Sequence, residues 1–234
     1  MARLKKPDPD AELNMPQPAL RRLPQYFGYL VQQQEQGVRI ISSSRIAEDL
    51  NLHPVQVRKD MALTRVSGKP RTGFDVQALI DELARMLDYN NLKNAVVVGC
   101  GHLGSALLNY RGFQGYGLNL MAGFDSNPEL IGSRVGDVPI YALDELDSIV
   151  HENHVQIGVI TVPRDHAQDV CDRLVGAGIK AIWNFAPTHL FVPADIIVQN
   201  ENIAASLSVL SKRLSDQQLR MRSGQVPGDD RDRS

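Results

Sequence analysis

A glycine-rich loop at residues 99–104 is the pattern in this sequence that most directly indicates chemistry. It contains Gly99, Cys100, Gly101, His102, Leu103 and Gly104, between an apolar run at 95–98 and a predicted helix at 103–110. Such a loop lets a pyrophosphate approach the backbone, where the amide groups at the start of the helix bind it. The glycine spacing alone is weak evidence, but its place between strand and helix predicts that all six residues form a dinucleotide site.

Asp125 follows the loop by 21 residues, at the end of the next predicted strand, 118–124. A carboxylate there accepts hydrogen bonds from the ribose hydroxyls of an adenosine and repels a 2′-phosphate, which predicts NAD+/NADH over NADP. Two later strand ends close the other half of the cleft. We therefore expect the nicotinamide to lie against Thr161, Val162, Pro163, Asn184, Phe185, Ala186 and Pro187.

The side chains of Cys100 and His102 offer two further possibilities, a reactive thiol and a general base. Because the backbone of such a loop binds the phosphates, we favour a spacer role for both residues. Cys100 and Cys171 show no spacing typical of a metal site or a disulfide framework. The sequence therefore predicts neither a metal site nor catalytic residues.

A second, basic region is typical of nucleic-acid binding. Residues 52–74 carry a net charge of +4, whereas residues 89–200 carry −5. Predicted helices at 45–50 and 54–64 flank a short turn, and a turn-rich loop follows at 65–74, which indicates a winged helix-turn-helix. A solvated polar helix face is the alternative explanation of the same residues.

A helical wheel of residues 54–64 places Val57, Met61 and Thr64 on the inner face and Lys59 on the outer face, flanked by Gln56 and Arg58. We expect these three polar residues to lie in or near the major groove of double-stranded DNA. The expected phosphate contacts are Arg21, Arg22, Ser43, Ser44, Lys69 and Arg71.

The elements that position these residues predict an α/β chain with a winged helix-turn-helix domain at 16–88 and a Rossmann domain at 90–200. From residue 94, strands alternate with helices, which favours a parallel sheet covered on both faces. A C-terminal helix at 201–215 carries Ile203, Leu207, Leu210 and Leu214 on one face. Residues 1–15 and 216–234 are predicted to be flexible tails. No apolar run is long enough to span a membrane, so we expect a cytoplasmic protein.

The sequence resembles the Rex family of redox-sensing transcriptional repressors over roughly residues 16–214. The matching segments are dispersed and specific as a set: 22–24 with Tyr26 and Tyr29, then 41–43, 56–60, 99–110, 124–125, 138–141, 161–163 and 184–190. The resemblance implies a homodimer in which the last helix is exchanged between subunits. It also implies that NADH closes the dimer, moves the two recognition helices out of register with their operator half-sites and releases the DNA.

Two departures from the family pattern bear on operator choice and on the redox response. After the recognition helix the family usually has Ser-Tyr-Phe-Gly, where this chain has Ala62, Leu63, Thr64 and Arg65. Many relatives also carry an acid at the position of Asn202.

Other function classes remain open on the residues alone. A small NAD-dependent oxidoreductase is one, although no side-chain constellation near the cleft indicates hydride chemistry and residues 90–200 leave no room for a substrate domain. A CoA- or nucleotide-binding module is the other, because related Rossmann domains hold CoA. The ribose-binding position of Asp125 favours NAD(H) over CoA.

Overall fold

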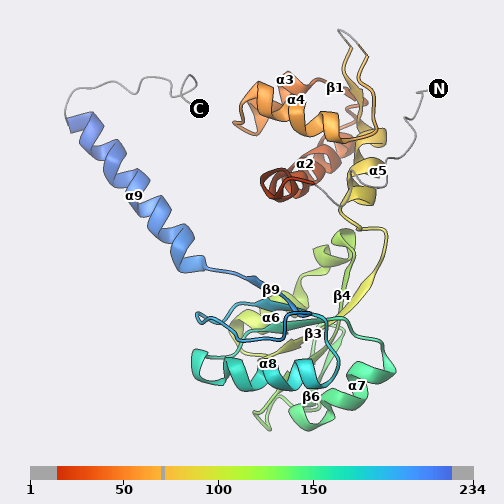
Figure 1. Ribbon diagram of the computed structural model, residues 1–234, viewed down its shortest axis with the longest axis vertical. Coiled ribbons are helices and arrows are strands. Elements are labelled where there is room, and N and C mark those ends of the chain that lie inside the picture. Colours follow the sequence, from red (N-terminus) through yellow and green to blue (C-terminus); the bar gives the residue numbers. More distant parts are fainter. Residues whose placement is uncertain (1–14, 70–71, 223–234) are drawn as a thin grey trace. The chain divides into compact units, whose positions relative to one another are not determined.

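The computed structural model describes residues 15–69 and 72–222, and it divides into two compact units between Asn91 and Leu92 (Figure 1). The predicted tail at 1–15 therefore lies almost wholly outside the described residues, as do Arg71 and, from residue 223 on, the predicted tail at 216–234. The two units are described one at a time.

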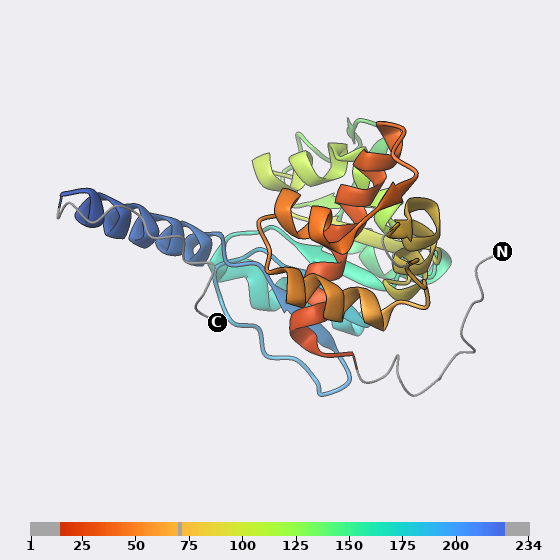
Figure 2. The same cartoon turned by 90° about the horizontal axis from the view of Figure 1, so that it is seen from above.

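The N-terminal unit is a small helical domain with a two-stranded wing, and its packed helices can be followed in Figures 1 and 2. Its elements are α2 (Gln17–Glu35), β1 (Ile40–Ile41), α3 (Ser43–Asp49), α4 (Pro54–Leu63), β2 (Phe74–Asp75) and α5 (Val76–Met86). Helix α2 packs on α5 and α3 packs on α4. Strands β1 and β2 pair antiparallel. The fully buried side chains between these elements include Leu23, Tyr26, Leu30, Ile46, Leu79 and Leu83.

Local hydrogen bonds explain where the two short helices begin. The Ser42 hydroxyl accepts from the Arg45 backbone N–H at 3.1 Å, which caps α3. His53 Nδ1 accepts from the Val55 N–H at 3.2 Å, and Pro54 occupies the first position of α4, where a missing N–H costs nothing. The helix-turn-helix predicted from the sequence is confirmed, and α3 begins two residues earlier than expected.

The second unit is a seven-stranded sheet in the order β5-β6-β4-β3-β7-β8-β9, parallel except for the hairpin strand β5. Its elements are β3 (Lys93–Val98), α6 (His102–Asn109), η1 (Arg111–Tyr116), β4 (Leu118–Asp125), β5 (Arg134–Val135), β6 (Val138–Ala142), η2 (Leu143–Glu145), α7 (Leu146–Glu152), β7 (Ile157–Ile160), η3 (Arg164–His166), α8 (Ala167–Gly176), β8 (Ala181–Asn184) and β9 (Ile197–Asn200).

The order of the strands reverses around β3, since the chain leaves it first towards β4 and later towards β7. Ligands of doubly wound sheets bind at such a reversal, beyond the carboxyl ends of the strands. A large core covers one face of the sheet and includes Val98, Phe124, Ile160 and Leu174. A smaller core on other strand residues includes Val97, Leu108, Ile140 and Val159.

Helix α9 (Ile203–Arg222) continues past the predicted end at residue 215, so the start of the predicted tail, 216–222, is helical. An ion pair of 2.8 Å between Lys212 and Asp216, one turn apart, stabilises this extension. Leu207, Leu210 and Leu214 are each more than half exposed. Among the described residues, no helix combines the length and the apolar character that crossing a membrane requires.

Candidate functional site

The glycine loop connects β3 to α6 through close contacts that only glycine permits. Gly99 has a φ of +98°, and a Cβ there would lie 2.8 Å from Val162 Cγ1. A Cβ on Gly104 would lie 1.9 Å from the Gly99 carbonyl oxygen. A Cβ on Gly101 would meet no heavy atom within 4 Å. Gly99 and Gly104 therefore serve packing, whereas Gly101 leaves open space at the backbone that a ligand can occupy.

Helix α6 starts at His102, with Gly101 as its N-cap and no side-chain capping bond, so its first amide groups suit an anion. The Asp125 carboxylate lies at the same place. It accepts hydrogen bonds from the backbone N–H groups of Cys100, at 2.6 Å, and Asn127, at 2.9 Å. Amide donors for a pyrophosphate and a carboxylate for ribose hydroxyls thus meet at the loop, and this donor set fits a dinucleotide.

Cys100 is 2% exposed, and its Sγ donates to the Phe124 carbonyl at 3.5 Å. Burial, reinforced by the charge of Asp125, raises the pKa of the Cys100 thiol to about 12. The thiol therefore stays protonated near neutral pH, which argues against a reactive cysteine. His102 and Leu103 are exposed at the start of α6. Among the described residues, no cluster of three or more His, Cys, Asp or Glu side chains could hold a metal ion.

Thr161, at the end of β7, joins that strand to the glycine loop. Its hydroxyl donates to the Gly99 carbonyl at 2.7 Å and lies 3.1 Å from the Val98 carbonyl oxygen. Val162 is half-buried and Pro163 is exposed. The predicted segment 161–163 thus lies directly beside the loop.

Asn184 was predicted to contact the cofactor, but its side chain binds other residues of the protein. It is fully buried, and its amide nitrogen donates to Asn200 Oδ1 at 2.8 Å and to the Thr188 carbonyl at 3.0 Å. Its Oδ1 accepts from the Ala186 N–H at 3.0 Å. The Asn184 side chain therefore holds the loop in shape instead of facing a ligand. Ala186 is also buried, Phe185 is half-buried and Pro187 is exposed.

The outer face of α4 carries the exposed side chains of Arg58, Lys59 and Ala62, while Val57 and Met61 are buried. This arrangement matches the helical-wheel prediction. Arg21, Ser44 and Lys69 are likewise exposed and Ser43 is half-buried. Lys69 stands in the wing loop, where its backbone N–H donates to the Gly73 carbonyl at 2.8 Å.

Two predicted DNA contacts, Arg22 and Gln56, are instead bound to Asp60. Arg22 donates through Nε to Oδ2 at 2.7 Å and through Nη2 to Oδ1 at 2.9 Å. Gln56 Nε2 donates to Oδ1 at 3.0 Å and the Tyr26 hydroxyl donates to Oδ2 at 2.7 Å. Asp60 is 2% exposed, so these side chains compensate a buried carboxylate.

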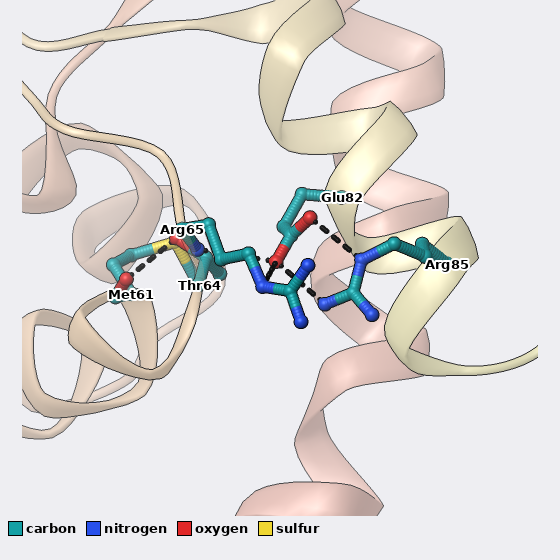
Figure 3. A network of polar contacts seen from close by, with 5 residues as sticks. All are labelled: Met61, Thr64, Arg65, Glu82 and Arg85. Carbon is teal, nitrogen blue, oxygen red and sulfur yellow. Dashed lines mark hydrogen bonds and ion pairs between the residues drawn. The ribbon is translucent and has the colours of Figure 1, made fainter. Parts of the chain in front are cut away.

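A second buried carboxylate, Glu82 on α5, holds the residues that follow α4, the helix predicted to enter the major groove (Figure 3). Its Oε1 accepts from the Arg65 N–H at 3.2 Å, and the Arg85 guanidinium donates to both Glu82 oxygens at 2.8 and 2.9 Å. The Thr64 hydroxyl donates to the Met61 carbonyl at 2.7 Å. Two departures from the Rex pattern, Thr64 and Arg65, thus have defined partners that the sequence did not reveal. The spacing of Glu82 and Arg85 on one helix face was the available signal.

Comparisons with known proteins match both units. Residues 14–62 match a family model described as a putative DNA-binding protein N-terminus, and residues 90–188 match one described as a CoA binding domain. The redox-sensing transcriptional repressor Rex of Bacteroides thetaiotaomicron is 39% identical over 206 residues, 88% of this chain and 94% of that protein. The Rex protein of Treponema denticola is 40% identical over 193 residues, which are 82% and 92% of the two chains.

Solved structures give the same result in three dimensions. RSP, a Rex-family repressor, in complex with NAD+ and operator DNA superimposes with a TM-score of 0.80 at 34% identity, covering 92% of this chain and 99% of RSP. RSP in complex with NADH gives a TM-score of 0.79 at 36% identity, covering 89% and 98% of the two chains.

Proposed function

The chain belongs to the Rex family of redox-sensing transcriptional repressors, and from this premise we propose how its own residues bind nucleotide and operator DNA. It is a DNA-binding repressor that senses the NADH/NAD+ ratio, and not an enzyme. The observation that carries this function is that one repressor, solved with NAD+ and operator DNA and again with NADH, matches about nine-tenths of this chain in both states.

In the nucleotide site, the backbone of residues 99–104 binds the pyrophosphate and Asp125 binds the adenosine ribose. We assign the nicotinamide to the cleft beside residues 161–163 and the loop of Phe185, Ala186 and Pro187, with Asn184 as the support of that loop. When bound, NAD(H) supplies a ring that is neutral in the reduced form and positively charged in the oxidised form. Half-buried Val162 and Phe185 supply apolar side chains beside this position, which favours the neutral ring.

On the DNA side, Lys59 and Arg58 enter or flank the major groove. Arg21, Ser43, Ser44, Lys69 and Arg71 hold phosphates, and Arg22 and Gln56 keep α4 in position through Asp60. The chain acts as a homodimer through the exposed leucine face of α9, because two half-sites require two recognition helices at a fixed spacing. We place it in the cytoplasm with its operator.

A CoA-binding module is the second candidate, because residues 90–188 match the CoA binding domain model. Asp125 argues against it. CoA carries a phosphate on its ribose, and the carboxylate at the end of β4 would repel that phosphate.

Fluorescence anisotropy of a duplex from the upstream region of the gene tests the function. The duplex is titrated with the full chain alone, with NAD+, with NADH and with CoA. We expect NADH to release the DNA and NAD+ and CoA to leave it bound. Release of the DNA by CoA at a lower concentration than by NADH would favour the second candidate. A DNA affinity that no nucleotide changes would contradict the redox-sensing role.

Calorimetric titration of NADH into the Asp125→Ala variant tests the assigned pocket. The expected loss of affinity is about ten- to a hundredfold, since the variant loses a charged hydrogen-bond acceptor. Asp137→Ala is the matched control, because Asp137 is 91% exposed at the β5–β6 turn. Equal NADH affinity in the Asp125 variant and the control would show that Asp125 does not bind NADH.

A further inference from the structure

Three hydrogen bonds join the end of strand β8 to Asn200 and Glu201, which lie shortly before the start of α9 at Ile203. The indole N–H of Trp183 donates to Glu201 Oε1 at 2.9 Å, and the backbone N–H of Glu201 donates to the Asn184 carbonyl at 2.8 Å. The Asn184 amide nitrogen donates to Asn200 Oδ1 at 2.8 Å. The segment leading into α9 is therefore attached to β8 by side chains as well as by the sheet.

The same strand end carries the loop assigned to the nicotinamide. Asn184 is fully buried and binds the Ala186 N–H through its oxygen while its nitrogen binds Asn200. The Trp183 and Phe185 rings lie with their centroids 4.8 Å apart. A displacement of the 185–187 loop therefore acts on both Trp183 and Asn184, which hold the residues before α9.

Glu201 is placed to transmit such a displacement to α9. It lies two residues before the first residue of that helix, whose N-terminus is capped by Asn202 Oδ1 accepting from the Ala205 N–H at 2.8 Å. Glu201 is half-buried, as is Trp183. A hydrogen bond to a charged acceptor in such a place is stronger than one between neutral groups.

We propose that the Trp183–Glu201 hydrogen bond is a latch that couples the nicotinamide side of the cleft to helix α9, with Trp183 and Glu201 as positioning residues for the redox response. This inference rests on the proposed function, because it names the contact through which nucleotide binding reaches the dimer helix. A ligand shifts a conformational equilibrium only through contacts that differ between the two states, and the latch is such a contact. Neither side chain needs to touch the nucleotide or the DNA.

The test separates coupling from stability. Trp183→Phe removes the indole N–H but keeps an aromatic ring in the row with Phe113 and Phe185. Glu201→Ala removes the acceptor, whereas Glu201→Gln keeps a carbonyl oxygen at the same place. Glu152→Ala is the control for loss of an exposed glutamate from the same unit.

For each full-length variant, calorimetry gives the Kd for NADH, and anisotropy gives the Kd for the duplex with and without saturating NADH. We expect Trp183→Phe and Glu201→Ala to keep both single-ligand affinities within about threefold. The ratio of the two DNA Kd values should fall about tenfold, in line with the loss of one charged hydrogen bond. Glu152→Ala should keep the wild-type ratio, and Glu201→Gln, which keeps a neutral acceptor, should give a ratio between those of Glu201→Ala and the wild type.

Because Trp183 is the only tryptophan, its fluorescence reports the contact directly. The emission maximum should change in Glu201→Ala and stay unchanged in Glu152→Ala. A wild-type ratio in both Trp183→Phe and Glu201→Ala would overturn the latch while leaving the proposed function intact. A lower NADH affinity with an unchanged ratio would show a merely structural contact and would also overturn it. A wild-type chain that ignores NADH would overturn the proposed function, and the latch with it.

Discussion

Arg22 on α2 holds Asp60 on the recognition helix α4 with two parallel hydrogen bonds, of 2.7 and 2.9 Å. Asp60 follows Lys59 directly, so the carboxylate that anchors the helix inside the domain adjoins the side chain expected to meet DNA. The orientation of the exposed face of α4 is therefore set by a contact on its buried side.

Replacing Arg22 with alanine should destabilise the N-terminal unit by about 3 kcal/mol, because it leaves a buried carboxylate without its cation. Arg21→Ala is the matched control, since the neighbouring Arg21 is exposed. Urea denaturation followed by circular dichroism gives the free energy of unfolding of both variants. Equal stability of the two would show that Tyr26 and Gln56 alone compensate Asp60.

Stability of the N-terminal unit should fall as the solution is acidified. Burial alone would raise the pKa values of Asp60 and Glu82, but hydrogen bonds from Arg22, Tyr26 and Gln56 to Asp60, and from Arg85 and Arg65 to Glu82, lower both below their usual values. A carboxyl group with a lowered pKa in the folded state contributes stability above its unfolded pKa of about 4, and this contribution is lost as the pH falls through the folded value. Denaturation in urea between pH 7 and pH 3 measures it. Glu82→Gln should flatten the dependence, and an unchanged slope would exclude Glu82 as a contributor.

Two alanine substitutions in the glycine loop should affect different properties of the nucleotide-binding unit, its stability in one case and its NADH affinity in the other. Gly104→Ala places a Cβ 1.9 Å from the Gly99 carbonyl oxygen, so it should lower the melting temperature of the nucleotide-binding unit. Gly101→Ala points into open space, so it should keep the melting temperature and lower NADH affinity by obstructing the pyrophosphate. Calorimetry and thermal denaturation distinguish the two variants. Normal NADH affinity in Gly101→Ala would show that the pyrophosphate does not lie against Gly101.

The main helices and the glycine loop are predictable because periodicity, caps and glycine spacing are local properties. Strands β6 and β9 were not predicted, since β6 contains Pro139 and β9 ends in polar Gln199 and Asn200. The inward turn of Asn184 was also missed. It depends on Asn200, sixteen residues further on, and only the pairing of β8 with β9 brings the two amides together. Arg22 and Gln56 were assigned to DNA because nothing in the local sequence shows that Asp60 is buried.

Lys59→Ala should weaken operator binding without changing NADH affinity, because Lys59 is exposed on the outer face of α4. If it contacts a phosphate as well as a base, the slope of log K against log salt should fall by about 0.9 for each lost contact. Anisotropy at several salt concentrations measures the slope. Lys180→Ala, which removes an exposed lysine from the second unit, is the control. Identical DNA affinity in the two variants would remove Lys59 from the interface.

Helix α9 should dimerise the chain through one face only. Leu207, Leu210 and Leu214 recur at helical spacing and are 54 to 64% exposed, an arrangement that a second copy would cover. Leu210→Glu would bury a charge in that contact and should yield a monomer. A monomer should bind operator DNA weakly, because its one recognition helix binds one half-site without a second helix linked to it. Leu219→Glu makes the same substitution on the opposite side of the same helix, where Leu219 is 62% exposed, and should remain dimeric. Sedimentation velocity of both variants gives the result. A dimeric Leu210→Glu variant would place the subunit interface elsewhere, and monomers in both variants would mean that the whole surface of α9 is covered.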